Sequence, residues 1–305
     1  MKLSEEILWS IELANLYNAN DVAKLRKQCN ELLDLLAYLH EVLAEEKVAV
    51  EEYEIMSEQL VIKFYLHGIT ICKISEGFKL TSEYIKHPNL SKVDFVDISS
   101  LLTVGRAQLE TLLMYQHLYV NSQNRDEQKL RYFSWIYTAL LQRRETPANE
   151  IETKIQKEKD EREILRFKAE MEKLESFKNL SLKQQKSLFE TGTAKLFKNW
   201  QTIFDESGFS KEQLFSKLYY ILSAYSHSEG LSVIQMKSAK QLLSNKANHD
   251  MVHLHTICSI LMTSIMIKNV VSKHEAVAKR FDKVERKKQF TVDFFSRLGR
   301  GMPNT

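Results

Sequence analysis

Few residues in this chain interrupt helices. Its 305 residues include eight glycines and three prolines, and no Asn-Gly or Asp-Gly pair marks a tight turn. A β-sandwich or an α/β fold needs many more turns than this composition supplies. The sequence therefore predicts an all-α protein, a multi-helix bundle in which long helices are joined by short connections.

Cysteine is also scarce. The three cysteines are far apart and odd in number, so they fit neither a disulfide framework nor a Cys-x-x-Cys metal site. We interpret Cys29, Cys72 and Cys258 as buried thiols of a protein in a reducing compartment. Acidic residues near the N-terminus interrupt the apolar stretch that a signal peptide needs, and the apolar run at 256–267 is too short to span a bilayer. We expect a cytoplasmic protein without membrane contact.

Common cofactor and nucleophile motifs are missing. The sequence contains no G-x-G-x-x-G fingerprint, no P-loop and no G-x-S-x-G motif. We therefore expect no bound cofactor. The net charge of +3 neither indicates nor excludes a nucleic-acid partner.

One histidine-rich stretch has partial metal-ligand spacing. His249 and His253 share a helix face, as two ligands of a divalent metal do. Asp250 is rotated by about 100° from His249, His255 faces away from His253, and the glutamate of a zinc-protease helix is absent. We interpret the stretch as the polar start of a helix capped by Asn248, although a metal at His249 and His253 stays open.

Hydrophobic periodicity divides the chain into three segments. Residues 1–88 are predicted to form an N-terminal helical layer, which ends at His87-Pro88-Asn89 because the residue before proline avoids the helical region. Residues 94–286 are predicted to form the main bundle, and residues 287–305 a basic tail.

Local signals predict the individual helices. Ser4 and Asp21 are expected to cap the first two helices, and Gly68 and Gly77 weaken a third. The remaining caps and stripes predict the third helix over about 48–84 and later helices over about 101–120, 127–144, 182–190, 194–204, 210–227, 232–243 and 248–286.

A charged insertion at about 149–178 interrupts the main bundle. Residues 150–174 carry charges of both signs and only a thin apolar stripe. We predict a long, largely solvated helix that projects from the bundle or is half-packed on it. A coiled coil is the sharper alternative, but the heptad fails between Ile155 and Ile164. This helix is where we expect a protein partner, and an oligomer also stays open.

Two apolar helical segments carry polar groups at helical spacing. Arg106 and Glu110 lie one turn apart in 101–120, and Ser223 and His227 lie one turn apart in the later segment. A charge on a buried helix must be paired. We predict that the two helices pack together, that Glu110 orients the His227 imidazole, and that Arg106 holds an anion.

A structural interpretation of the same residues competes with this one. Arg106 and Glu110 can satisfy each other, and His227 with its neighbouring serines can satisfy the loose carbonyls of a helix end. The four residues would then be a buried polar network that fixes the register of two helices.

The segments RAQLETLLMYQHLYV and ILSAYSHSEGL resemble a family of bacterial all-α proteins related to the HEPN (higher eukaryotes and prokaryotes nucleotide-binding) domains. Those proteins have an Arg-x-x-x-Glu helix and a later Ser-x-x-x-His helix, which match Arg106, Glu110, Ser223 and His227 here. The resemblance covers about residues 94–234. It implies a metal-independent ribonuclease or nucleotide-modifying toxin of antiphage or toxin–antitoxin systems, or a member that has lost activity.

The resemblance has one departure. Ribonuclease members carry an arginine on the same helix as the histidine, with four to six residues between the two. Before His227 those positions hold Tyr220, Ile221 and Leu222, so the standard ribonuclease centre is absent. Two interpretations remain: an effector acting on RNA or a nucleotide, and a non-catalytic helical interaction module.

Overall fold

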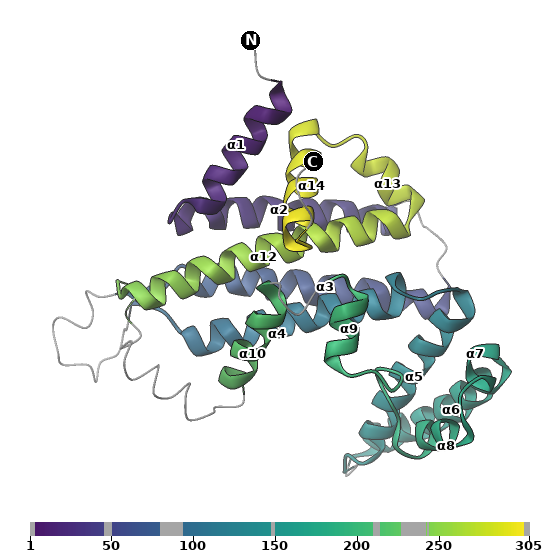
Figure 1. Ribbon diagram of the computed structural model, residues 1–305. Helices are drawn as coiled ribbons and strands as arrows, with labels where there is room; N and C mark the ends of the chain where they lie inside the picture. Colours follow the sequence, from purple (N-terminus) through teal and green to yellow (C-terminus); the bar gives the residue numbers. More distant parts are fainter. Residues whose placement is uncertain are drawn as a thin grey trace, which may run out of the picture. The chain divides into compact units, whose positions relative to one another are not determined.

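Helices account for most of the chain that the computed structural model describes, which is residues 4–45, 51–79, 94–147, 150–209, 214–226, 242 and 244–301 (Figure 1). In chain order the helices are α1 Glu5–Asn18, α2 Val22–Glu45, α3 Glu52–Ile74, α4 Ile98–Tyr115, α5 Arg125–Arg144, α6 Ile151–Lys173, α7 Glu175–Lys178, α8 Leu182–Thr191, α9 Trp200–Glu206, α10 Leu214–Ser226, α12 Lys246–Lys273, α13 Glu275–Phe281 and α14 Arg286–Gly299. Strands β1 Phe78–Lys79 and β2 Asp94–Phe95 pair antiparallel. The predicted all-α class is confirmed.

Contacts divide the chain into two compact units. Unit 1 comprises Met1–Ala49, Ser57–Leu113 and Gly208–Thr305, and unit 2 comprises Val50–Met56 and Met114–Ser207. The units do not follow the segments predicted from sequence, because helices from both ends of the chain belong to unit 1.

Helix α12 is the centre of unit 1. It packs along α2 and against α14, and α13 packs against both α2 and α12 (Figure 1). The buried face of α2 includes Leu25, Cys29, Leu32, Leu36 and Leu39 at helical spacing. By length and composition α12 could cross a membrane, which corrects the expectation drawn from 256–267 alone. However, 83% of its most apolar window is buried inside the protein, as in a core helix.

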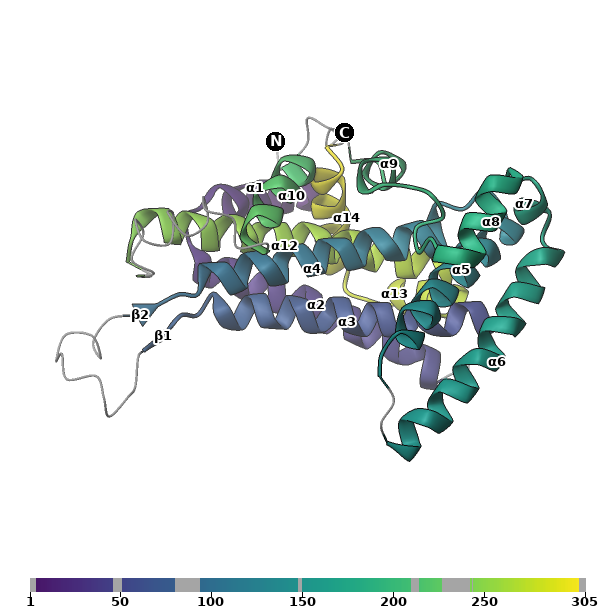
Figure 2. The same cartoon turned by 90° about the horizontal axis from the view of Figure 1, so that it is seen from below.

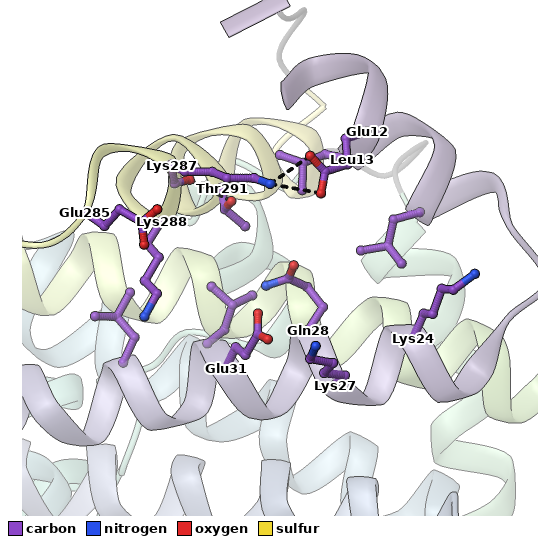
Figure 3. Close-up of a pocket in the computed structure, with 13 residues that line it drawn as sticks. Glu12, Leu13, Lys24, Lys27, Gln28, Glu31, Glu285, Lys287, Lys288 and Thr291 are labelled. Carbon is purple, nitrogen blue, oxygen red and sulfur yellow. Dashed lines mark hydrogen bonds and ion pairs between the residues drawn. The ribbon is translucent and has the colours of Figure 1, made fainter. Parts of the chain in front are cut away.

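Helix α3 lies against α2 and α4 (Figure 2). At Gly68 an added Cβ would be 2.7 Å from Leu33 Cδ2 on α2 and 2.9 Å from Gln108 Nε2 on α4. The glycine thus serves close packing, and α3 is one uninterrupted helix. It ends at Ile74 rather than near residue 84, because Gly77 at φ 74° turns the chain into β1.

The C-terminal helices differ from the prediction. The cap of α12 is Asn245, whose side chain accepts a hydrogen bond from the Ala247 amide, whereas Asn248 is buried inside the helix and donates to the Leu242 carbonyl. Helix α12 ends at Lys273, because His274 has an extended backbone, so α12 does not reach residue 286. Most of the predicted basic tail belongs to α14, because Val292 and Phe295 are buried on the α12 side of that helix.

Unit 2 is built around α5, which packs on α6, α7 and α8. Its core contains Tyr132, Phe133, Phe167, Met171, Phe177 and Leu188. The predicted charged helix is helical as α6, but it is half-packed rather than projecting. Asp160 is buried on it and pairs with Arg143 of α5.

Other local features also shape unit 2. The π-helix Gln116–Val120 continues α4, and the buried Arg131 donates to the His117 carbonyl at 2.6 Å while pairing with Glu127. The helix predicted over 194–204 begins later, at Trp200, and ends at Glu206. Its first residues are not helical, since Leu196 and Phe197 have positive φ angles. Ser210 at the start of the predicted helix 210–227 and residues 232–241 of the predicted helix 232–243 lie outside the described residues, while Leu242 forms an isolated antiparallel bridge with Phe95.

The contact at Gly68 yields a stability prediction. Gly68→Ala should lower the free energy of unfolding by about 1–3 kcal/mol, because Leu33 and Gln108 must move. The overpacking outweighs the advantage of alanine over glycine in a helix, about 1 kcal/mol. Thermal unfolding should show a melting temperature several degrees below that of the wild type.

The matched control is Thr70→Ala on the exposed face of the same helix. Thr70 is exposed and only donates to the Leu66 carbonyl, so its replacement should leave the melting temperature almost unchanged. A Gly68→Ala protein as stable as the wild type would contradict the close packing of α2, α3 and α4.

Candidate functional site

A polar cluster joins α4 to α10. Arg106 Nε donates to Glu110 Oε1 at 2.8 Å, and Arg106 Nη2 donates to the Tyr219 hydroxyl at 3.3 Å. The Tyr219 hydroxyl in turn donates to Glu110 Oε1 at 3.0 Å. The predicted packing of these two helices is therefore confirmed, and Tyr219 closes the contact.

The cluster lies at the edge of the protein interior. The side chains of Arg106 and Glu110 are 18% and 29% exposed. Burial works against the Arg106 charge, but hydrogen bonding and attraction to Glu110 outweigh it, so the pKa of Arg106 is raised. Burial, reinforced by the Glu110 charge, also raises the pKa of Tyr219. The phenol therefore stays protonated and the guanidinium stays charged.

Arg106 also lies over an aromatic face. Its guanidinium carbon is 5.3 Å from the centroid of the Tyr219 ring, a cation–π distance. The ring and the carboxylate fix the direction of the guanidinium. A cation held in this way can meet a phosphate or carboxylate without first losing side-chain freedom.

The predicted α10 residues are only partly described. Ser223 Oγ donates to the Tyr219 carbonyl at 2.8 Å, which is a bond within the helix. His227 lies outside the described residues, so its predicted contact with Glu110 stays a prediction. Sequence reasoning did not include Tyr219 among the candidate site residues. Its position one turn before Ser223 is the signal that could have identified it.

Beneath the cluster, α4 approaches α12 at a glycine. A Cβ on Gly105 would lie 3.2 Å from His255 Cδ2 and 3.7 Å from Leu222 Cδ2 of α10. His255 is buried and its Nδ1 is 2.8 Å from the Met251 carbonyl. A carbonyl only accepts, so Nδ1 carries the hydrogen and Nε2 is an acceptor. Nε2 is buried without a hydrogen-bond partner.

No family model, curated protein or solved structure matches this chain. The chemistry of the cluster therefore rests on its own geometry: a fixed cation, a carboxylate, a phenol and, beneath them, a neutral imidazole.

The histidine-rich start of α12 does not gather ligands. Within the described residues, no group of three or more His, Cys, Asp or Glu side chains could hold a metal ion. His253 Nε2 is 2.8 Å from the Ala19 carbonyl, to which it must donate. That nitrogen is therefore committed to holding the end of α1 against α12.

The buried imidazole of His255 predicts a pH dependence of stability. Burial lowers its pKa from 6.5 to about 4, partly offset by the bond to the Met251 carbonyl. An unfolded chain takes up this proton near pH 6.5 and the folded chain only near pH 4. The free energy of unfolding is therefore undiminished by His255 above pH 6.5, and it decreases as the pH falls from 6.5 toward 4.

Replacing His255 tests this. His255→Leu removes the titrating group, so its melting temperature should fall less than that of the wild type between pH 6.5 and pH 4. The difference in unfolding free energy over this range should be about 3 kcal/mol. Thr256→Val, at a buried non-titrating neighbour, should keep the wild-type slope. Parallel curves for His255→Leu and the wild type would mean that folding does not lower the pKa of His255.

Proposed function

We propose that this chain is a HEPN-like bacterial effector that acts on RNA or a nucleotide in the cytoplasm, in antiphage defence or a toxin–antitoxin system. The proposed site is the cluster of Arg106, Glu110 and Tyr219 together with Ser223 of α10. We propose that His227, which lies outside the described residues, also belongs to it. The observation that carries the proposal is Arg106 held on the Tyr219 ring between two helices. Phosphate binding uses an oriented guanidinium, and a nucleobase can stack on an aromatic ring.

Each residue has a proposed role. Arg106 holds a phosphate oxygen, and Glu110 keeps the guanidinium in place. Tyr219 donates to or stacks on the ligand, and His227 serves as general acid or base. The reaction does not use the standard HEPN ribonuclease centre, because no arginine precedes His227 at the required spacing.

A second candidate function is a non-catalytic helical interaction module. It is favoured by the hydrogen bonds that Arg106, Glu110 and Tyr219 make with one another across the two helices. Such a set can fix the register of α4 and α10 without a ligand. The two candidates differ in what a single substitution should change.

Binding and growth should separate the candidates. If the cluster is a site, expression of the wild type should slow bacterial growth, and purified protein should bind single-stranded RNA or ATP. Arg106→Ala and His227→Ala should each remove toxicity and weaken binding by about tenfold or more, on the order of 1.4 kcal/mol. Their melting temperatures should fall by only a few degrees, since ligand sites contribute little to stability.

The matched control is Arg144→Ala, which removes an arginine from an exposed pair with Glu161. It should leave toxicity and binding unchanged. The interaction module predicts the opposite pattern: no toxicity and no binding by the wild type, with a large loss of stability in Arg106→Ala because Glu110 loses its charged partner.

A further inference from the structure

Unit 2 contains an open groove that the proposed function does not use. It has a volume of about 640 Å³ and lies between the first turn of α3 and the helices α5 and α6. Its apolar lining consists of Ile55, Met56, Tyr132, Ile136, Leu140 and Phe167. The last four extend the core of unit 2 to the surface, so the groove is floored by core side chains.

Two of these apolar side chains are exposed. Ile55 is 47% and Met56 36% exposed, although both lie next to the buried core of unit 2. Exposed apolar surface that continues into a groove is typical of a docking site. On α6, the exposed Ile155 and Ile151 lie about one and two turns before Lys159 of the groove lining.

The charges on the rim are unequally matched. The three carboxylates that line the groove are committed to two arginines: Asp160 to Arg143, and Glu52 and Glu163 to Arg166. Two further cations, Lys159 and Arg162, also line the groove on exposed turns of α6. Neither has a carboxylate partner among the described residues. The rim therefore has an uncompensated positive charge on one side.

We infer that this groove binds an amphipathic helix whose apolar face is flanked by acidic residues. Apolar side chains spaced at i, i+3, i+4 and i+7 would fill the floor, as in other helix-in-groove complexes. Their acidic neighbours would pair with Lys159 and Arg162. The lining of α6 from Gln156 to Phe167 spans about 18 Å, the length of about three helical turns.

This partner site is independent of the α4–α10 cluster. Its residues belong to unit 2, whereas Arg106, Glu110 and Tyr219 belong to unit 1. Failure of one proposal therefore leaves the other intact. Helix α6 is the charged helix on which we expect a protein partner. The face of α6 that carries Lys159 and Arg162 is then the part that contacts this partner.

The test uses a designed peptide. The full chain is titrated into a fluorescent helical peptide of about 14 residues. The peptide has leucines at i, i+3, i+4 and i+7 and glutamates beside them. A second peptide has lysines in place of the glutamates. The acidic peptide should bind saturably and the basic peptide at least about tenfold more weakly. The affinity of the acidic peptide should fall as salt is added.

Two variants locate the binding. Ile55→Glu places a charge in the floor, and the pair Lys159→Glu with Arg162→Glu reverses the free rim charge. Each should weaken binding of the acidic peptide by at least about tenfold, and the rim variant should prefer the basic peptide. Leu182→Glu, at an 83% exposed position of α8, should bind as the wild type does.

Several outcomes would overturn the inference. They are no saturable binding of the acidic peptide, equal binding of both peptides, or full binding by the rim variant, whose exposed substitutions leave the core intact. A wild-type dimer in sedimentation that Ile55→Glu converts to monomer would instead assign the groove to a second copy of the chain.

Discussion

The burial of α12 on all sides over residues 255–267 is the constraint on which unit 1 depends. A helix without a solvated face must be surrounded, and α2, α13 and α14 supply much of that cover. Two of its buried threonines are satisfied within the helix: Thr256 donates to the Val252 carbonyl at 2.8 Å and Thr263 to the Ser259 carbonyl at 2.7 Å. Glycines allow the closest approaches, as at Gly299, where a Cβ would lie 3.0 Å from Ile265.

The candidate site follows from this core. Helix α4 must approach α12 at Gly105, and the neighbouring Arg106 then falls on the side of α4 that meets α10. The interior therefore contains a neutral imidazole at His255, while the charged groups stay at the edge. Charges are kept where water can still reach them, and their cost of burial is limited.

Sequence patterns predicted the parts of this arrangement that depend on neighbours along the chain. Ser4 and Asp21 cap their helices, and Arg106 pairs with Glu110, because residues three or four apart meet on a helix wherever that helix lies. Partners across helices were harder to predict. An aromatic stripe shows that a face is covered but does not identify what covers it, so Tyr219 was missed. Likewise, the lysines and arginines of α14 suggested a basic tail, although Phe294 and Phe295 of this helix are buried.

The two units also differ in when their partners leave the ribosome. Cys29 of α2 and Ser259 of α12 touch across 230 residues of sequence, so α2 cannot bind α12 until that much more of the chain has been synthesised. In unit 2, by contrast, α5 meets α6 across only 17 residues at Arg143 and Asp160. Contacts that are close in sequence form first, and distant ones are slow. During synthesis the leucine stripe of α2 therefore lacks its α12 partner, which makes it the segment of the nascent chain that chaperones would protect.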